Sequence, residues 1–162
     1  MRQLFLIRHA KSSWDNPTLR DFERPLNERG MTIAPKMAAL MQARRPDLLV
    51  SSPARRAIDT ARYFAAACQI PEDEIVQVRE LYEASPTEIM RIISALPDTA
   101  QTVFMFGHNP SFTEVAYLLT DDFITNIPTC GIVQIVSDAP DWRSMYEGNS
   151  RIQEKWFPKL VL

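Results

Sequence analysis

The sequence predicts an α/β protein with three layers (α/β/α), in which helices cover both faces of a mostly parallel central sheet of about five to six strands. Three observations indicate this class. Short apolar runs alternate with longer segments of helical periodicity, as they do in βαβ units. Several of the helical segments begin with a capping residue followed by proline. Finally, the 162 residues contain no repeat and no linker-like tract, so one domain over residues 1–162 is expected.

The predicted strands are short runs rich in aliphatic and aromatic residues, bounded by polar or turn-forming positions. In chain order they lie near Leu4–Ile7, Leu48–Ser51, Ile75–Val78, Thr102–Phe106, Ile132–Val136 and Ile152–Trp156.

The predicted helices lie between most of these strands, at about Gly30–Arg44, Pro53–Cys68, Pro86–Leu96 and Pro110–Leu119. Pro35 falls inside the first of them, so that helix is expected to start or to bend there. The segment 138–150 is polar and rich in turn-forming residues, which favours a surface connection.

Three helix starts share one pattern. In Ser52-Pro53, Ser85-Pro86 and Asn109-Pro110, a good N-cap residue precedes a proline, which suits the first helical position because its missing N–H would be unpaired there. Glu88, three residues after Ser85, completes a capping box. The other two starts directly follow predicted strands.

The composition is that of an ordinary globular protein, with 46% hydrophobic and 23% charged residues. A net charge of -2 gives no electrostatic reason to expect nucleic acid as a partner. The two cysteines, Cys68 and Cys130, are too few for a disulfide framework and favour a reducing compartment. No signal-peptide pattern and no apolar run of membrane-spanning length occurs, so a cytoplasmic protein without membrane contact is expected.

Basic side chains gather at predicted strand ends. Arg8 and His9 follow the first strand, His108 follows the fourth, and Arg56 lies one turn inside the helix after the second. Ligands of α/β sheets bind at the carboxyl ends of the strands, and helix N-termini attract anions. Since His9 and His108 are the only histidines of the chain, their placement predicts a phosphate site with a nucleophile available.

The motifs Arg8-His9-Ala10, Ser52–Ala61 and Gly107-His108-Asn109-Pro110 resemble those of the histidine phosphatase superfamily, which has the phosphoglycerate mutase-like fold. Their order and spacing match across nearly the whole chain. The short length, together with Arg8–Trp14 and Arg24–Gly30, resembles the SixA-type phosphohistidine phosphatases.

This resemblance implies that His9 is the nucleophile, which accepts the phosphoryl group and passes it to water. It implies that Arg8 and Arg56 bind the phosphate and that His108 donates a hydrogen bond to a phosphoryl oxygen. Arg55 is the competing candidate for Arg56, but the family places alanine directly after the functional arginine. From the residues alone, nearby arginines keep the imidazole of His9 neutral, as a nucleophile must be.

The proton donor is less clearly indicated. In larger family members a glutamate after the third strand protonates the leaving group, and Glu80 stands nearest to that pattern, with Glu83 as a rival. Either glutamate could be a surface charge. A phosphohistidine substrate needs less help, because its imidazole leaves readily with a proton from solvent.

The chain departs from the family pattern in two ways. Ala10 stands where glycine is usual, so this turn is not expected to need a positive φ angle. The long insertions that larger members use to cover their substrates are absent, and an open pocket would suit a phosphate on a protein surface.

Three further basic residues, Lys11, Arg24 and Arg29, are candidates for an electropositive rim that steers an anionic substrate. Ordinary surface solvation explains them equally well. Arg24 is the best candidate for substrate binding, because Arg24-Pro25-Leu26 resembles a motif that recurs in the family, but it could instead anchor its loop through Asp21.

The leading functional hypothesis is a phosphatase that acts on phosphohistidine in a protein. The same fold could act on a small phosphomonoester or phosphoanhydride, and a non-catalytic phosphate-binding module is a third alternative. No cofactor is implied, and no cluster of histidine and acidic residues has the spacing of a metal site. The sequence does not indicate the oligomeric state.

Overall fold

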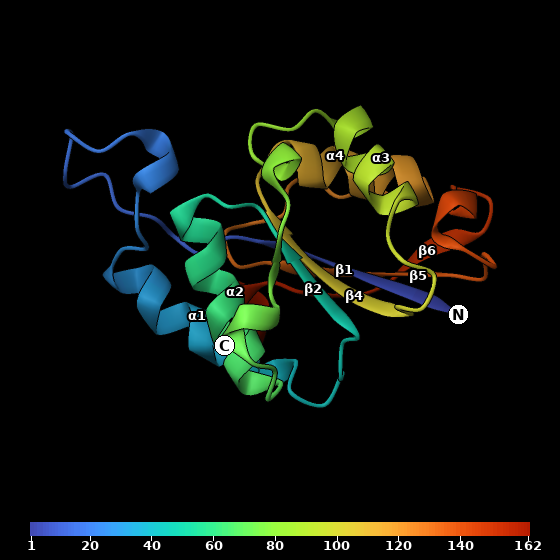
Figure 1. Cartoon of the computed structure of the whole chain (residues 1–162), viewed down its shortest axis with the longest axis horizontal. Coiled ribbons are helices and arrows are strands. Elements are labelled where there is room, and N and C mark those ends of the chain that lie inside the picture. Colours follow the sequence, from blue (N-terminus) through green and yellow to red (C-terminus); the bar gives the residue numbers. More distant parts are fainter.

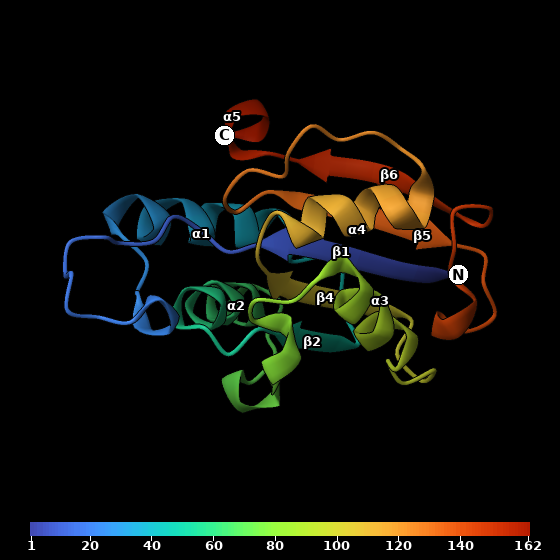
Figure 2. The same cartoon turned by 90° about the horizontal axis from the view of Figure 1, so that it is seen from above.

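A six-stranded sheet forms the middle of three layers, with helices on both of its faces (Figures 1 and 2). The structure, a computed structural model, describes residues 1–162. The predicted three-layer α/β class is confirmed, and every predicted strand is present. The strands are β1 (Arg2–Arg8), β2 (Leu48–Ser51), β3 (Val76–Gln77), β4 (Thr102–Gly107), β5 (Ile132–Ser137) and β6 (Ser150–Trp156).

The sheet has the strand order β3-β2-β4-β1-β5-β6 and is mostly parallel. Only β5 runs against its neighbours, since it pairs antiparallel with both β1 and β6. The parallel pairing of β1 and β2 with β4 brings their carboxyl ends, Arg8, Ser51 and Gly107, to the same edge. This edge is where an α/β sheet binds its ligands.

Four helices complete the outer layers. They are α1 (Glu28–Leu40) and α2 (Arg55–Ala67) on one face, and α3 (Pro86–Ser94) and α4 (Ser111–Thr120) on the other (Figure 1). None of the helices is both long enough and apolar enough to span a lipid bilayer.

Alternating side chains of the central strands fill two hydrophobic cores. In β1, Leu4 and Leu6 pack on the side of α3 and α4, whereas Phe5 and Ile7 pack on the side of α1 and α2. All four side chains are fully buried, and each contributes roughly 1.5–3 kcal/mol by leaving water. The strand that carries Arg8 and His9 is therefore held rigidly between both cores.

Of the three predicted helix starts, only Ser85-Pro86 is correct: Ser85 caps α3 and forms the capping box with Glu88. The Ser52-Pro53 prediction is wrong, because α2 begins at Arg55 and its N-cap is Ala54. The Ser52 hydroxyl instead accepts a hydrogen bond from the Ala54 N–H within the preceding turn.

The Asn109-Pro110 prediction is also shifted, because Pro110 itself is the N-cap of α4, after a cis peptide bond. Asn109 still serves the helix start, since its Oδ1 accepts a hydrogen bond from the Thr113 N–H at 3.2 Å.

The first helix starts earlier than predicted. Asn27 caps α1 by accepting a hydrogen bond from the Gly30 N–H, so Pro35 lies inside the helix and does not begin it. Gly30 is needed here because an added Cβ atom would lie 2.2 Å from the Lys11 carbonyl oxygen. This close contact docks α1 against the segment that follows His9.

The polar segment 138–150 is more than a surface connection. It contains a 3-10 turn, Trp142–Ser144, whose Trp142 side chain is fully buried and donates from Nε1 to the Ala100 carbonyl. Met145 of the same segment is also buried, so two large apolar side chains anchor a segment that is otherwise mostly polar. After β6, a short unpredicted helix, α5 (Pro158–Val161), lies at the same edge of the sheet as Arg8.

Candidate active site

Four of the six predicted site residues come together at the carboxyl edge of the sheet. The His9 and His108 rings lie 5.2 Å apart between centroids, at the ends of β1 and β4. Arg56, in the first turn of α2, and Arg8 are close enough for their charges to act on both histidines. His9 and Arg56 are buried, whereas Arg8 and His108 are half-buried.

His9 is a neutral imidazole with a free lone pair on Nε2. Its Nδ1 lies 2.7 Å from the Ala10 carbonyl oxygen. A carbonyl can only accept, so Nδ1 holds the proton and Nε2 keeps its lone pair. Burial is the main cause that lowers the pKa of His9 to about 4, and the charges of Arg56, Arg8 and Arg24 lower it further. The hydrogen bond to Ala10 acts in the opposite direction and raises the pKa. The ring is therefore neutral at neutral pH.

Ser52 holds His108 in the same Nδ1–H tautomer as His9. Its Nε2 lies 2.8 Å from Ser52 Oγ. That hydroxyl already accepts from Ala54 and has no other acceptor for its own proton, so it donates to Nε2 and leaves the ring proton on Nδ1. Burial, followed by the proximity of His9 and Arg56, lowers the pKa of His108 to about 3. His108 is thus a neutral N–H donor.

The site contains hydrogen-bond donors that have no acceptor. Four buried side-chain polar atoms of the protein lack a partner, and three of them are Arg8 Nε, Arg56 Nε and His108 Nδ1. The fourth, Gln134 Oε1, lies elsewhere in the sheet. An unpaired buried donor costs roughly 1–3 kcal/mol. A tetrahedral anion has enough acceptor oxygens to satisfy all three donors at once.

Asp21 is the residue of this site that the sequence indicated least. Its carboxylate accepts from Arg24 Nε at 3.1 Å, Arg56 Nη2 at 3.0 Å and the Tyr82 hydroxyl at 2.7 Å. Partial burial alone would raise the pKa of Asp21, but the hydrogen bonds from Tyr82, Arg56 and Arg24 outweigh it and lower the pKa to about 2. Asp21 is therefore ionised and holds Arg56 in place. In the sequence, the only sign of such a role was that Asp21 lies three residues before Arg24.

Arg24 does not belong to a solvent-facing rim. Its side chain is buried, donates to Ser12 Oγ at 2.8 Å and to Asp21, and lies 3.5 Å from the centre of the Trp14 ring. The structure therefore contains the Asp21 pair that the sequence offered as the alternative. Lys11 and Arg29, the other rim candidates, are exposed and form no ion pair.

Glu80 forms no hydrogen bond or ion pair with the four converging residues. It lies exposed in the 3-10 turn Arg79–Leu81 and forms no hydrogen bond or ion pair. Its rival Glu83 is also exposed and has a φ angle of 57°. The residue between them, Tyr82, is the one that reaches the site, with its ring 5.7 Å from that of His108.

Thr60 joins two of the functional segments. Its hydroxyl accepts from the Ala10 N–H at 2.9 Å and donates to the Arg56 carbonyl at 2.8 Å. Sequence reasoning did not single out Thr60. The signal that could have found it is the spacing of four residues from Arg56, which places both side chains on one face of the helix. The sequence predicted that Ala10 would not need a positive φ angle, and its φ angle is not positive.

The comparisons with known proteins point to one family. The profile of the histidine phosphatase superfamily (branch 1) matches residues 4–102. An uncharacterized chloroplastic protein of Arabidopsis thaliana is 30% identical over 156 residues, which cover 90% of this chain and 71% of that protein.

Solved structures share the whole fold. One, from Agrobacterium tumefaciens, carries the provisional name phosphohistidine phosphatase SixA; it is 29% identical, with a TM-score of 0.81, over 96% of this chain and 97% of that chain. The protein histidine phosphatase SixA in complex with tungstate also gives a TM-score of 0.81, at 20% identity and 98% coverage of both chains. The fold is thus phosphoglycerate mutase-like.

Proposed function

This chain belongs to the histidine phosphatase superfamily (branch 1), and we propose that it is a phosphatase whose substrate is phosphohistidine in a protein. The proposal assigns the roles of nucleophile to His9, of phosphate binding to Arg8 and Arg56, and of transition-state donor to His108. The likeness to the Agrobacterium tumefaciens structure supports the substrate class, at 29% identity over nearly the full length of both chains.

The unpaired donors are the observation that supports this function best. Arg8 Nε, Arg56 Nε and His108 Nδ1 are buried without acceptors, next to a histidine with a free lone pair. Such preorganised donors stabilise the charge that develops on the transferring phosphoryl group, and each typically contributes a factor of about 10²–10³ in rate.

The reaction takes place in two steps. His9 Nε2 attacks the phosphorus atom, the bond from phosphorus to the imidazole nitrogen of the substrate breaks, and that imidazole takes a proton from solvent. Water then attacks the phosphorus atom on His9, which releases inorganic phosphate and restores the neutral ring. Throughout, Arg8, Arg56 and His108 hold the phosphoryl oxygens.

The carboxyl groups near the site favour a substrate with a good leaving group. Asp21 is the one carboxylate hydrogen-bonded within the site, and its pKa of about 2 leaves it no proton to donate at neutral pH. Glu80 is exposed and would need solvent or a bound substrate to connect it to the chemistry. Glu83 is also exposed and is linked to the site only through Tyr82, whose pKa it helps to raise. An imidazole leaving group depends least on such a donor, so we retain Glu80 only as a proton donor for less reactive substrates.

The proposal is tested by trapping the phosphoenzyme. The chain is mixed with a carrier protein bearing radiolabelled phosphohistidine and quenched in alkali, because phosphohistidine is stable there and labile in acid. We expect label on the chain and its loss in His9→Ala. Arg56→Gln should reduce kcat/KM by about 10²–10³. Arg55→Gln is the matched control, since Arg55 is exposed and pairs only with Asp59, and its kcat/KM should stay within about twofold of wild type.

The same experiment separates the alternatives. A panel containing a phosphomonoester and pyrophosphate gives relative kcat/KM values, and a clear preference for either over the phosphohistidine protein contradicts the proposed substrate. Binding of phosphate without any labelled adduct would instead identify a non-catalytic module.

A further inference from the structure

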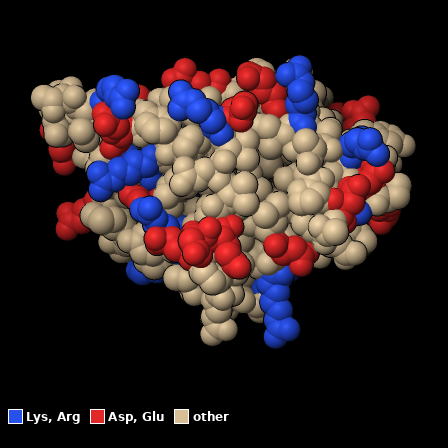
Figure 3. Space-filling view, in the orientation of Figure 1, with Lys and Arg blue, Asp and Glu red and all other residues tan.

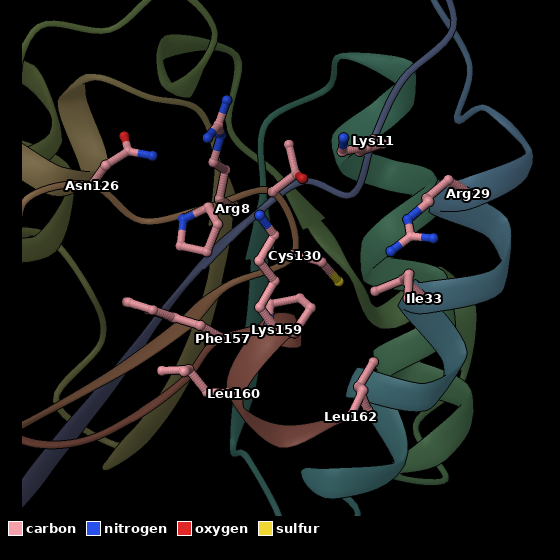
Figure 4. Close-up of a pocket in the computed structure, with 13 residues that line it drawn as sticks. Arg8, Lys11, Arg29, Ile33, Asn126, Cys130, Phe157, Lys159, Leu160 and Leu162 are labelled. Carbon is pink, nitrogen blue, oxygen red and sulfur yellow. The ribbon is translucent and has the colours of Figure 1, made fainter.

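A groove of about 790 Å³ adjoins the candidate active site at Arg8. Its polar wall includes Lys11, Arg29 and Lys159, which come from the segment after His9, from α1 and from α5 (Figure 4). The volume lies within the range of ligand-binding sites, roughly 300–1,000 Å³. Arg8 belongs to both this groove and the proposed phosphate site, so an occupant of the groove can be joined to the phosphoryl group.

The groove is lined by cationic side chains and by no acidic side chain. Apart from Arg8, it is lined by Lys11, Arg29 and Lys159, and no acidic residue lines it. None of these four cations takes part in an ion pair; of the other fourteen Lys and Arg residues, six do: Arg20, Arg24, Arg44, Arg55, Arg56 and Arg62.

Elsewhere the two signs of charge are mixed. Figure 3 shows Lys and Arg interspersed with Asp and Glu over the face of the molecule seen in Figure 1. In a chain with a net charge of -2, four cations that line one groove without an acidic side chain form a local positive patch, which favours an anionic occupant.

The opposite part of the groove is apolar. Figure 4 shows Phe157, Leu160 and Leu162 below the cationic side chains, with Ile33 on the side of α1. Leu160 and Leu162 are 78% and 53% exposed, which is more than a closed small-molecule pocket would leave open to water. Exposed apolar side chains bordered by charged ones are typical of protein interaction surfaces.

We propose that this groove docks the segment of a substrate protein that flanks its phosphohistidine, and that it selects acidic residues beside an apolar one. The proposal rests on the proposed function of the site. Carboxylates of the partner pair with Lys11, Arg29 and Lys159, and its apolar side chain packs against Phe157, Leu160 and Leu162. The phosphoryl group then reaches Arg8 and His9. The positive rim of the groove thus contains Lys159 in addition to the predicted Lys11 and Arg29, and it does not contain the predicted Arg24.

Two phosphohistidine peptides of equal length test the selection. One has Glu and Leu around the phosphohistidine, and the other has Gln and Ser. Exposed ion pairs are individually weak, so we expect kcat/KM to favour the acidic peptide by about tenfold at low salt, with the preference shrinking as salt is added. In the groove variant K11Q/R29Q/K159Q the ratio of the two kcat/KM values should fall to near one.

The matched control removes the same number of positive charges outside the groove. K36Q/R91Q/R143Q changes exposed side chains that do not line it, and this variant should keep the tenfold preference. Equal rates for both peptides in the wild-type chain, or an unchanged preference in the groove variant, overturns the proposal.

Direct binding separates this proposal from the proposed function. The acidic peptide without phosphate is titrated into the isotope-labelled chain, and we expect amide shift changes at Lys11, Arg29 and Lys159 in the wild type that are lost in the groove variant. If neither peptide is hydrolysed but these shifts occur, the substrate assignment fails and the docking site stands. No shifts in the groove, or equally tight competition by succinate, contradicts a protein-docking role.

Discussion

The ionisation of the two histidines is the most direct test of the site, because the chain contains no others. Burial lowers the pKa of His9 to about 4 and that of His108 to about 3, from an ordinary value of 6.5. At pH 5, a pKa of 4 leaves about nine-tenths of His9 neutral, whereas the ordinary value would leave about 3%. The structure therefore predicts about 30 times more nucleophile at that pH than a solvent-exposed histidine would supply.

Long-range proton–nitrogen spectra of the labelled chain measure this ionisation directly, because the chain has only two imidazole rings and each tautomer has its own pattern. Between pH 8 and 5 we expect both rings to stay neutral, with the proton on Nδ1 in each. His108→Gln identifies the remaining signals as those of His9. A midpoint near 6.5 for either ring, or a proton on Nε2 of His9, would refute the reasoning from burial and from the Ala10 and Ser52 contacts.

The same pKa shifts predict how stability depends on pH. Because both folded pKa values are depressed, the unfolded chain binds more protons below pH 6.5, so acidification favours unfolding. The stability that neutral histidines provide is complete above pH 6.5 and is lost as pH falls toward 4 and 3. From pH 7 to 5.5 the free energy of unfolding should drop by about 1 kcal/mol for each histidine. Urea denaturation measures the drop, and His108→Gln should roughly halve it.

Two further substitutions test the surroundings of the site. Asp21→Asn removes the charge that holds Arg56, and we expect kcat/KM to fall by about tenfold with the fold retained by circular dichroism; unchanged kinetics would show that Arg56 is positioned without it. Gly30→Ala places a methyl group against the Lys11 carbonyl and should cost about 1–3 kcal/mol in thermal unfolding. Gly148→Ala is its control, since the added methyl group there meets only the exposed ring of Tyr146, and an equal loss in both variants would contradict the packing argument.

The layers of the fold could be predicted from the sequence because the central strands are recognisable as short apolar runs. Runs such as Leu4–Ile7 and Val103–Phe106 are apolar at every position, and each of their side chains is buried in one of two cores. The helix starts were harder to predict. Ser52-Pro53 has a good local pattern for a cap, but the hydroxyl of Ser52 is used by His108, a tertiary contact that local pattern does not contain.

The site residues that could be predicted from the sequence are those of a distinctive residue type at the end of a recognisable strand. Arg8, His9 and His108 follow strand ends, and parallel pairing places those ends together. Asp21 and Tyr82 were not predictable in this way, because each lies in an irregular segment, and they meet only through the path of two loops. The role of Arg24 was unpredictable for a similar reason. An arginine on an exposed rim and an arginine buried in an ion pair can have the same local sequence.

Burial accounts for both the reactivity and the binding capacity of the site. Removing His9 from water keeps its ring neutral and therefore nucleophilic, and it leaves Arg8 Nε, Arg56 Nε and His108 Nδ1 without solvent acceptors. The free energy that these groups cost in the empty site is recovered when phosphoryl oxygens replace the missing partners, so substrate binding and activation have one physical origin. A site opened to water would lose both together: the histidines would titrate near 6.5, and the donors would already be satisfied.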